Sequence, residues 1–179
     1  ATSGVTSTLY AALVAAGAMI ATRCCTIAEA RRSLDFTVLV TIGASFALGA
    51  ALQKTGAAAM LGDSAVGLAG DNPLLLLAMT YFGVSILTEL ITNNAAALLM
   101  LPVVLAATSS LGLPPEPYVI TTMIAASASF ATPLGYQTNL MVFGPGGYRF
   151  ADFMRVGILM NLLGGVITIA VVPRFFPLG

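Results

Sequence analysis

The sequence predicts an all-α, polytopic membrane protein, and three observations support this fold class. First, 58% of the 179 residues are hydrophobic and 8% are charged, with a mean hydropathy of +0.97, whereas soluble domains carry about 25% charged residues. Second, several apolar runs approach the length of a membrane span. Third, two polar clusters interrupt apolar runs, which predicts a re-entrant helical hairpin and a discontinuous transmembrane helix. The alternative is an unusually buried soluble helical core.

The N-terminal part is predicted to supply two scaffold helices to a single transmembrane domain over residues 1–179. The first covers residues 5–22, and the second covers residues 36–53, where many small residues permit close helix packing. Residues 23–35 are polar and predict an interfacial loop or a short amphipathic helix. Residues 54–71 mix charged residues with glycines, so we expect a short surface helix there rather than a span.

A hairpin is predicted over residues 73–110. Its arms, residues 73–87 and 95–107, are apolar, and the tip between them reads TELITNN over residues 88–94. The turn is short and contains no Lys or Arg, whereas short cytoplasmic loops carry an excess of basic residues. We therefore expect the tip to stop inside the protein at membrane depth, which makes the hairpin re-entrant.

A broken helix is predicted over residues 118–145, after a proline-rich loop at residues 111–117. Its interruption reads ATPLGYQTN over residues 131–139. Pro133 and Gly135 lie inside this interruption, and these two residue types disfavour a continuous helix. A last spanning helix is predicted over residues 156–176.

The basic residues predict an orientation. Five of the seven Lys and Arg residues share one side of the membrane if the hairpin enters and returns and the broken helix crosses once. The positive-inside rule makes that side cytoplasmic. We expect a multi-pass protein of the cell (plasma or inner) membrane. The five residues are Arg23, Arg31, Arg32, Arg149 and Arg155.

The two polar clusters are the candidate functional site. Polar side chains in an apolar medium cost on the order of several kcal/mol unless they meet partners or a ligand. Neutral side-chain oxygens suit a sodium ion, amide and hydroxyl donors suit an anion, and backbone carbonyls freed at a helix break can bind cations. Helix capping or interhelical hydrogen bonding remains the plainer interpretation of each residue alone. The side chains concerned are Thr92, Asn93, Asn94, Thr132 and Asn139.

Glu89 is the only ionisable residue at the hairpin tip. Since the chain has no His, Glu89 is also the only candidate there for a proton carrier. It lies four residues before Asn93, which places both on one face of a helical arm, one turn apart. We expect a supporting role, in which Glu89 holds the tip through hydrogen bonds or lends negative charge to a sodium site.

The sequence favours no enzymatic function. Without His there is no imidazole base and no HExxH metal motif, and Glu116 and Asp152 do not form a carboxylate pair. Cys24 and Cys25 are adjacent, which suits neither a disulfide framework nor a metal site. A formal net charge of zero offers no basic face for nucleic acid. The expected partners are therefore a small anionic substrate and the lipid bilayer.

The two clusters resemble motifs of the divalent anion/sodium symporters, the solute carrier 13 type of the ion transporter superfamily. Residues 88–95, TELITNNA, resemble the Ser-Asn-Thr signature of that family's hairpin tip. Ala131-Thr132-Pro133, followed by Asn139, resembles its second broken-helix motif, and residues 135–148 resemble a subgroup of permeases with soluble regulatory domains. The resemblance implies an inverted-repeat carrier that works by alternating access. This chain would be its C-terminal repeat, paired with an N-terminal repeat and forming a homodimer.

The resemblance also implies roles for individual residues. The implied ligands of the coupling ion, Na⁺, are Thr88, Ile91, Asn93 and the carbonyl of Ala131. The residues implied to contact the substrate anion are Thr92, Asn93, Asn94, Thr132, Pro133 and Asn139. The sequence departs from the family at two places, since Asn94 stands where Thr is usual and Leu134-Gly135 follows Pro133 where Pro-Asn is usual. Dicarboxylate and sulfate both remain candidate substrates.

We therefore expect a secondary active transporter that takes up a divalent anion with sodium. The alternatives in transport are a sodium/proton antiporter and a metalloid-oxyanion exporter of the same superfamily. The alternative from another class is a non-transporting membrane scaffold subunit. Uptake by vesicles that contain the full-length carrier separates these functions, because a scaffold moves no solute and an antiporter moves protons without the anion.

Overall fold

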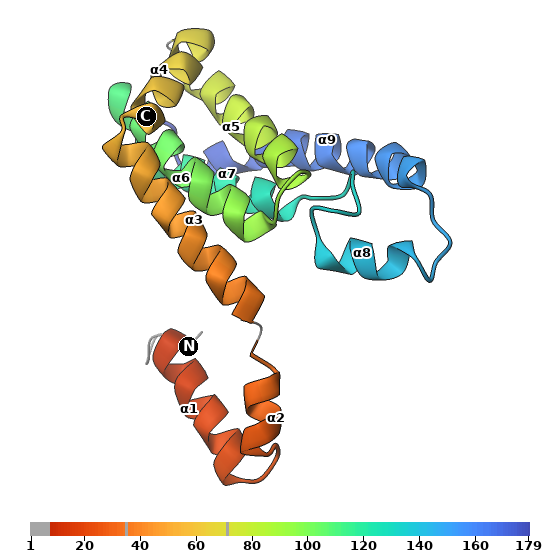
Figure 1. Ribbon diagram of the computed structural model, residues 1–179. Coiled ribbons are helices and arrows are strands. Elements are labelled where there is room, and N and C mark those ends of the chain that lie inside the picture. Colours follow the sequence, from red (N-terminus) through yellow and green to blue (C-terminus); the bar gives the residue numbers. More distant parts are fainter. Residues whose placement is uncertain (1–7, 35, 71) are drawn as a thin grey trace. The chain divides into compact units, whose positions relative to one another are not determined.

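The computed structural model describes residues 8–34, 36–70 and 72–179, and all regular structure in these ranges is helical. The predicted all-α fold class is therefore confirmed for the described residues. The chain divides into two compact units, residues 1–40 and 41–179. The helices are α1 (Thr8–Ala21), α2 (Ile27–Arg32), α3 (Phe36–Lys54), α4 (Ala57–Ala69), α5 (Pro73–Thr88), α6 (Asn93–Ser110), α7 (Glu116–Ser127), α8 (Gln137–Phe143) and α9 (Phe150–Phe175) (Figure 1).

The first unit contains α1, α2 and the start of α3. Residues 5–7 of the first predicted scaffold helix lie outside the described residues. The helix α2 lies in the polar segment 23–35 and begins with a capping box, because the Thr26 side chain accepts from the Glu29 N–H at 3.2 Å and the Glu29 carboxylate accepts from the Thr26 N–H at 2.8 Å. Hydrogen bonds from the Thr26 backbone and hydroxyl lower the pKa of the Glu29 carboxyl. This carboxyl is fully exposed, as expected outside the membrane.

The second unit is built around α5, α6, α7 and α9, with α4 packed against α6 (Figure 1). In α4, Gly62 is buried, and a Cβ added there would lie 2.9 Å from the Ala107 nitrogen of α6. The Ser110 hydroxyl of α6 also donates to the Asp63 carboxylate of α4 at 3.0 Å. The segment expected to form a short surface helix thus packs closely on α6, because its small residues allow close approach and its carboxylate has a partner.

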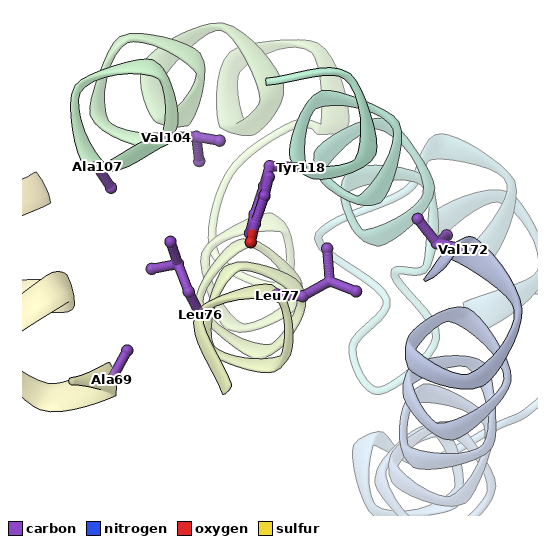
Figure 2. Packing of buried hydrophobic residues seen from close by; sticks show 7 residues of the cluster. All are labelled: Ala69, Leu76, Leu77, Val104, Ala107, Tyr118 and Val172. Carbon is purple, nitrogen blue, oxygen red and sulfur yellow. The ribbon is translucent and has the colours of Figure 1, made fainter. Parts of the chain in front are cut away.

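The main hydrophobic cluster surrounds Tyr118 of α7 (Figure 2). This ring has no exposed surface, and its hydroxyl donates to the Pro73 carbonyl of α5 at 3.0 Å. The phenol therefore fills the core and also satisfies its polar end, which fixes the start of α7 against the start of α5. The other members of the cluster are Ala69, Leu76, Leu77, Val104, Ala107 and Val172.

Among the residues that the structure describes, two helices are long and apolar enough to cross a membrane, α6 and α9, and several of the other helices are shorter but also apolar. Many large apolar side chains lie on the outside of the second unit, for example Ile86 of α5, Met123 of α7 and Ile167 of α9. A surface of this kind is expected where a protein meets lipid or another apolar partner. The re-entrant course of α5 and α6, and the passage of α7 and α8 through one membrane span, stay predictions.

The start of the last helix differs from the expected residue 156, and the break in the broken helix covers residues 128–136 instead of the expected 131–139. The last helix, α9, begins at Phe150, because the Arg149 N–H donates to the Asp152 carboxylate at 2.8 Å and closes the first turn. The segment expected to hold the broken helix contains α7 and α8, separated by the non-helical residues 128–136. This separation and the turn between α5 and α6 lie at the same end of the second unit (Figure 1).

Candidate functional site

The first polar cluster forms the turn between α5 and α6. The helix α5 ends at Thr88, and Thr92 serves as the N-cap of α6, where its hydroxyl accepts from the Ala95 N–H at 3.4 Å. The Asn93 side-chain oxygen accepts from the Asn94 N–H at 2.8 Å. No acidic residue lies in the first turn of α6. The start of α6 therefore offers the Thr92 hydroxyl and two side-chain amides without an acidic residue in its first turn, while side-chain oxygens already accept from the N–H groups of Asn94 and Ala95.

The second polar cluster covers most of the non-helical stretch between α7 and α8 (residues 128–136, the second break). Asn139 of α8 ties this stretch together, because its side-chain nitrogen donates to the Ser129 carbonyl at 2.9 Å and to the Thr132 carbonyl at 3.2 Å. The Gly135 N–H donates to the Thr132 hydroxyl at 3.3 Å. The backbone that leaves the helix is thus satisfied by side chains, as buried polar groups require.

Glu89 joins the two clusters. The residue is 8% exposed, and its carboxylate accepts from the Ala131 N–H at 2.9 Å, the Thr132 N–H at 2.7 Å and the Ser129 hydroxyl at 3.4 Å. The side-chain nitrogen of Asn161 in α9 is the fourth donor, at 2.7 Å. Four donors, two on each oxygen, suit an ionised carboxylate, which only accepts hydrogen bonds. We call these four hydrogen bonds the Glu89 latch.

Further hydrogen bonds connect the end of α5 to α7 and to the second break. The Thr88 hydroxyl donates to the Ala126 carbonyl at 2.8 Å, and the Ser129 hydroxyl lies 3.3 Å from the Thr88 carbonyl. The Thr132 hydroxyl donates to the Glu89 carbonyl at 2.9 Å. These contacts use backbone carbonyls that the helices leave unpaired. The turn between α5 and α6 and the segment from the end of α7 through the second break thus supply hydrogen-bond partners to each other.

Gly135 allows this close approach. A Cβ added at Gly135 would collide with the Ser129 hydroxyl and the Thr88 carbonyl, and it would lie 3.2 Å from the Glu89 Cα. Any side chain at this position would therefore push the second break away from the hairpin tip. Gly135 therefore permits the close packing of the second break on the hairpin tip, in addition to lying in a helix break.

The structure brings some of the predicted site residues together and leaves others apart. Glu89, Ala131 and Thr132 are joined by direct hydrogen bonds, and Thr88 is linked to them through Ser129. Thr92 and Asn94 are exposed, Ile91 and Asn93 are half-buried, and in the described part of the chain no hydrogen bond joins these four to the second break. Pro133 is buried within the second break, and the Asn139 side chain donates two hydrogen bonds to that break.

Two residues of the site were missed in the sequence, Ser129 and Asn161. Asn161 is the only amide within the apolar helix α9, and a strongly polar side chain inside an apolar span is itself a sign of a functional or packing role. The sequence alone therefore contains a signal for Asn161. It does not indicate that Glu89 is the hydrogen-bond partner, because Glu89 and Asn161 are 72 residues apart.

A cavity of about 420 Å³ lies between α8, α9 and the second break. Its walls are largely apolar, with Asn139 and Asp152 as polar members. An anion would find a like charge there and few donors to replace its water. The apolar wall residues are Phe130, Val142, Phe153, Val156 and Met160.

Comparison with known proteins gives consistent relatives. A family model described as citrate transporter matches residues 2–178. An uncharacterized transporter of Synechocystis is 38% identical over 150 residues, which cover 82% of this chain and 24% of the relative. The probable sodium/sulfate cotransporter 3 of Chlamydomonas reinhardtii is 35% identical over 151 residues, covering 82% of this chain and 17% of the relative. A sodium-dependent dicarboxylate transporter of Staphylococcus aureus is 29% identical over 150 residues, covering 84% and 29%.

These relatives agree with the resemblance found in the two motifs, since two of them are named for sodium together with sulfate or dicarboxylate. They are transporters and not enzymes, and a transporter family implies a membrane protein. The chain spans less than a third of the length of each relative. By the match over residues 2–178, the chain belongs to the citrate transporter family.

Proposed function

We propose that this chain forms part of a secondary active carrier that couples the uptake of a divalent anion, sulfate or a dicarboxylate, to sodium. The observation that supports the proposal most is the Glu89 latch. It fixes a helix turn against a helix break through three hydrogen bonds to one buried carboxylate, and a fourth hydrogen bond ties that carboxylate to α9. Non-helical backbone at membrane depth is tolerated where protein or a wet cavity surrounds it, and carriers use such breaks to bind ions and substrates.

Sodium would bind at the end of α5, where Thr88, Ile91, Asn93 and the carbonyl of Ala131 are its proposed ligands. The residues fit this ion in one respect that the geometry supports. The Thr88 hydroxyl donates its hydrogen to the Ala126 carbonyl, so the lone pairs of the hydroxyl oxygen remain available to a cation. The negative charge of Glu89, the next residue, favours a cation nearby.

The anion would bind at the start of α6, with Thr92, Asn93, Asn94 and Thr132 in contact with it. The N-terminal end of a helix carries partial positive charge, which attracts anions. Thr92 and Asn94 are exposed there and available to a ligand. Pro133 and Asn139 would shape the second break behind Thr132. The N-terminal repeat of the same carrier would supply the other half of the site, in a homodimer in the cell membrane.

Uptake by the full-length carrier in vesicles tests the proposal. Labelled sulfate, succinate and citrate are offered separately, each with an inward sodium gradient, with potassium in its place, and with a proton gradient alone. We expect uptake of at least one divalent anion that requires sodium. Uptake that follows the proton gradient in sodium-free buffer, or no uptake of any anion, would contradict the proposal, and the latter result would favour a scaffold.

A further inference from the structure

We propose that Asn161 of α9 is a positioning residue for the carrier, because it fixes the Glu89 carboxylate and through it the relative placement of the hairpin tip and the second break. This inference rests on the proposed function. It assigns a transport role to a helix that contributes no residue to the expected sodium and anion sites.

The geometry of the amide supports this role. The Asn161 side-chain nitrogen donates to Glu89 Oε1 at 2.7 Å, the same oxygen that accepts from the Ala131 N–H at 2.9 Å. The Asn161 side-chain oxygen is buried and has no hydrogen-bond partner in the described part of the chain. A rotated amide would place that oxygen against the carboxylate and lose the bond. Asn161 therefore leaves its oxygen unpaired in order to donate to Glu89, although such an oxygen is costly.

Close packing of α9 places the amide there. A Cβ added at Gly157 would collide with the Phe130 carbonyl and the Ala131 Cα, so α9 touches the backbone of the second break one turn before Asn161. At Gly164 an added Cβ would lie 2.6 Å from the Tyr81 hydroxyl. This hydroxyl donates to the backbone carbonyl of Asn161 at 3.2 Å. These contacts on both sides of Asn161 hold α9 against the second break and α5.

The chemistry around Glu89 explains why the loss of one donor matters. All four donors to the carboxylate are uncharged groups, two backbone N–H groups, one hydroxyl and one amide. The hydroxyl of Ser129 is the longest contact, at 3.4 Å. Without Asn161 the carboxylate retains two short hydrogen bonds, both from the second break, and loses its only tie to α9. The second break could then shift relative to the last helix.

The test uses the full-length carrier with Asn161→Leu, which keeps a similar volume and removes the donor, and Asn161→Gln, which keeps the amide on a longer chain. Thr168→Val is the matched control, because Thr168 is buried on α9 about two turns beyond the latch. We measure the sodium concentration for half-maximal uptake and the maximal rate. We expect Asn161→Leu to raise the half-maximal sodium concentration about tenfold, Asn161→Gln to restore part of this loss, and Thr168→Val to match the parent.

A second readout does not depend on transport. In a background without Cys24 and Cys25, a cysteine replaces the buried Ala128, which lies in the second break and packs with Tyr81 and Val84 of α5. We expect Asn161→Leu to raise the rate of thiol labelling at this position several-fold, and Glu89→Gln to raise it similarly. The double variant should label no faster than the faster single variant, because residues that act through one bond are not additive.

The proposed function and the positioning role of Asn161 can fail separately. If the parent shows sodium-dependent uptake and Asn161→Leu equals Thr168→Val in both readouts, the positioning role of Asn161 is wrong and the proposed function stands. If the parent moves no anion with sodium, the proposed function is wrong, and the labelling rate still decides whether Asn161 holds the second break.

Discussion

At the scale of single residues, the candidate site depends on how one carboxylate is buried. Glu89 is nearly without exposed surface, yet it is satisfied by four donors from two other segments of the chain, the second break and α9. An acceptor-only group surrounded by N–H and O–H donors is a stable way to bury negative charge. Holding the tip through hydrogen bonds is part of the supporting role expected for Glu89, and that role stays a prediction.

We predict that Glu89→Gln destabilises the full-length carrier and slows its transport. Glutamine has nearly the same shape, but its NH₂ group would face the N–H of Ala131 or Thr132 and leave that donor buried without an acceptor. Such a loss costs about 1–3 kcal/mol. Thermal unfolding measures it, with Glu116→Gln as the control because Glu116 is exposed at the start of α7. Equal transition temperatures for the two variants would refute the latch.

The proposed ion and anion contacts predict that Asn93→Ala reduces sodium-dependent uptake by roughly tenfold or more, since a lost ligand or buried hydrogen bond costs about 1–3 kcal/mol. Ser85→Ala is the comparison, because Ser85 is buried in α5 before the tip. It should leave uptake within a few-fold of the parent. Mild and equal effects of the two changes would reduce the tip to an ordinary helix cap.

At the scale of elements, the sequence predicted where polar backbone would interrupt the helices, because apolar runs and clusters such as residues 88–94 are local signals. It did not predict how the interruptions meet. The contacts of Glu89 with Ala131, Thr132 and Asn161 join residues 42 to 72 positions apart, and no local pattern encodes such a separation. The packing of α4 was missed for a related reason, since the partner of Asp63 is Ser110 on another helix.

The contact between α9 and the second break gives a prediction for Gly157. Gly157→Ala should lower the thermal stability of the full-length carrier, because the new methyl group would collide with the Phe130 carbonyl and the Ala131 Cα, which are backbone atoms that cannot turn aside. Overpacking of this kind costs about 1–3 kcal/mol. Gly83→Ala is the matched control in α5, since an added Cβ there meets nothing within 4 Å and helix propensity favours alanine by about 1 kcal/mol. If Gly157→Ala proves as stable as Gly83→Ala, the close contact is absent.

At the scale of the whole molecule, the chain spans less than a third of the length of each of these relatives. The outward-facing apolar side chains of the second unit and the exposed polar start of α6 have different expected partners. The apolar side chains suit lipid or other helices, whereas the polar start of α6 suits a hydrated ligand. In the proposed carrier, the Glu89 latch would hold the turn before α6 in place against the second break.

The central claim is that the turn before α6 forms an ion and anion site inside the membrane, and the accessibility of a cysteine at Thr92 tests it most directly. In the full-length carrier without other cysteines, small thiol reagents that cannot cross the membrane are applied from each side, with and without sodium and a transported anion. We predict that the cysteine reacts from one side at a time and is protected when sodium and the anion are both present. Free reaction from the cytoplasm in every condition would contradict the claim, because the turn would then be an ordinary loop outside the membrane.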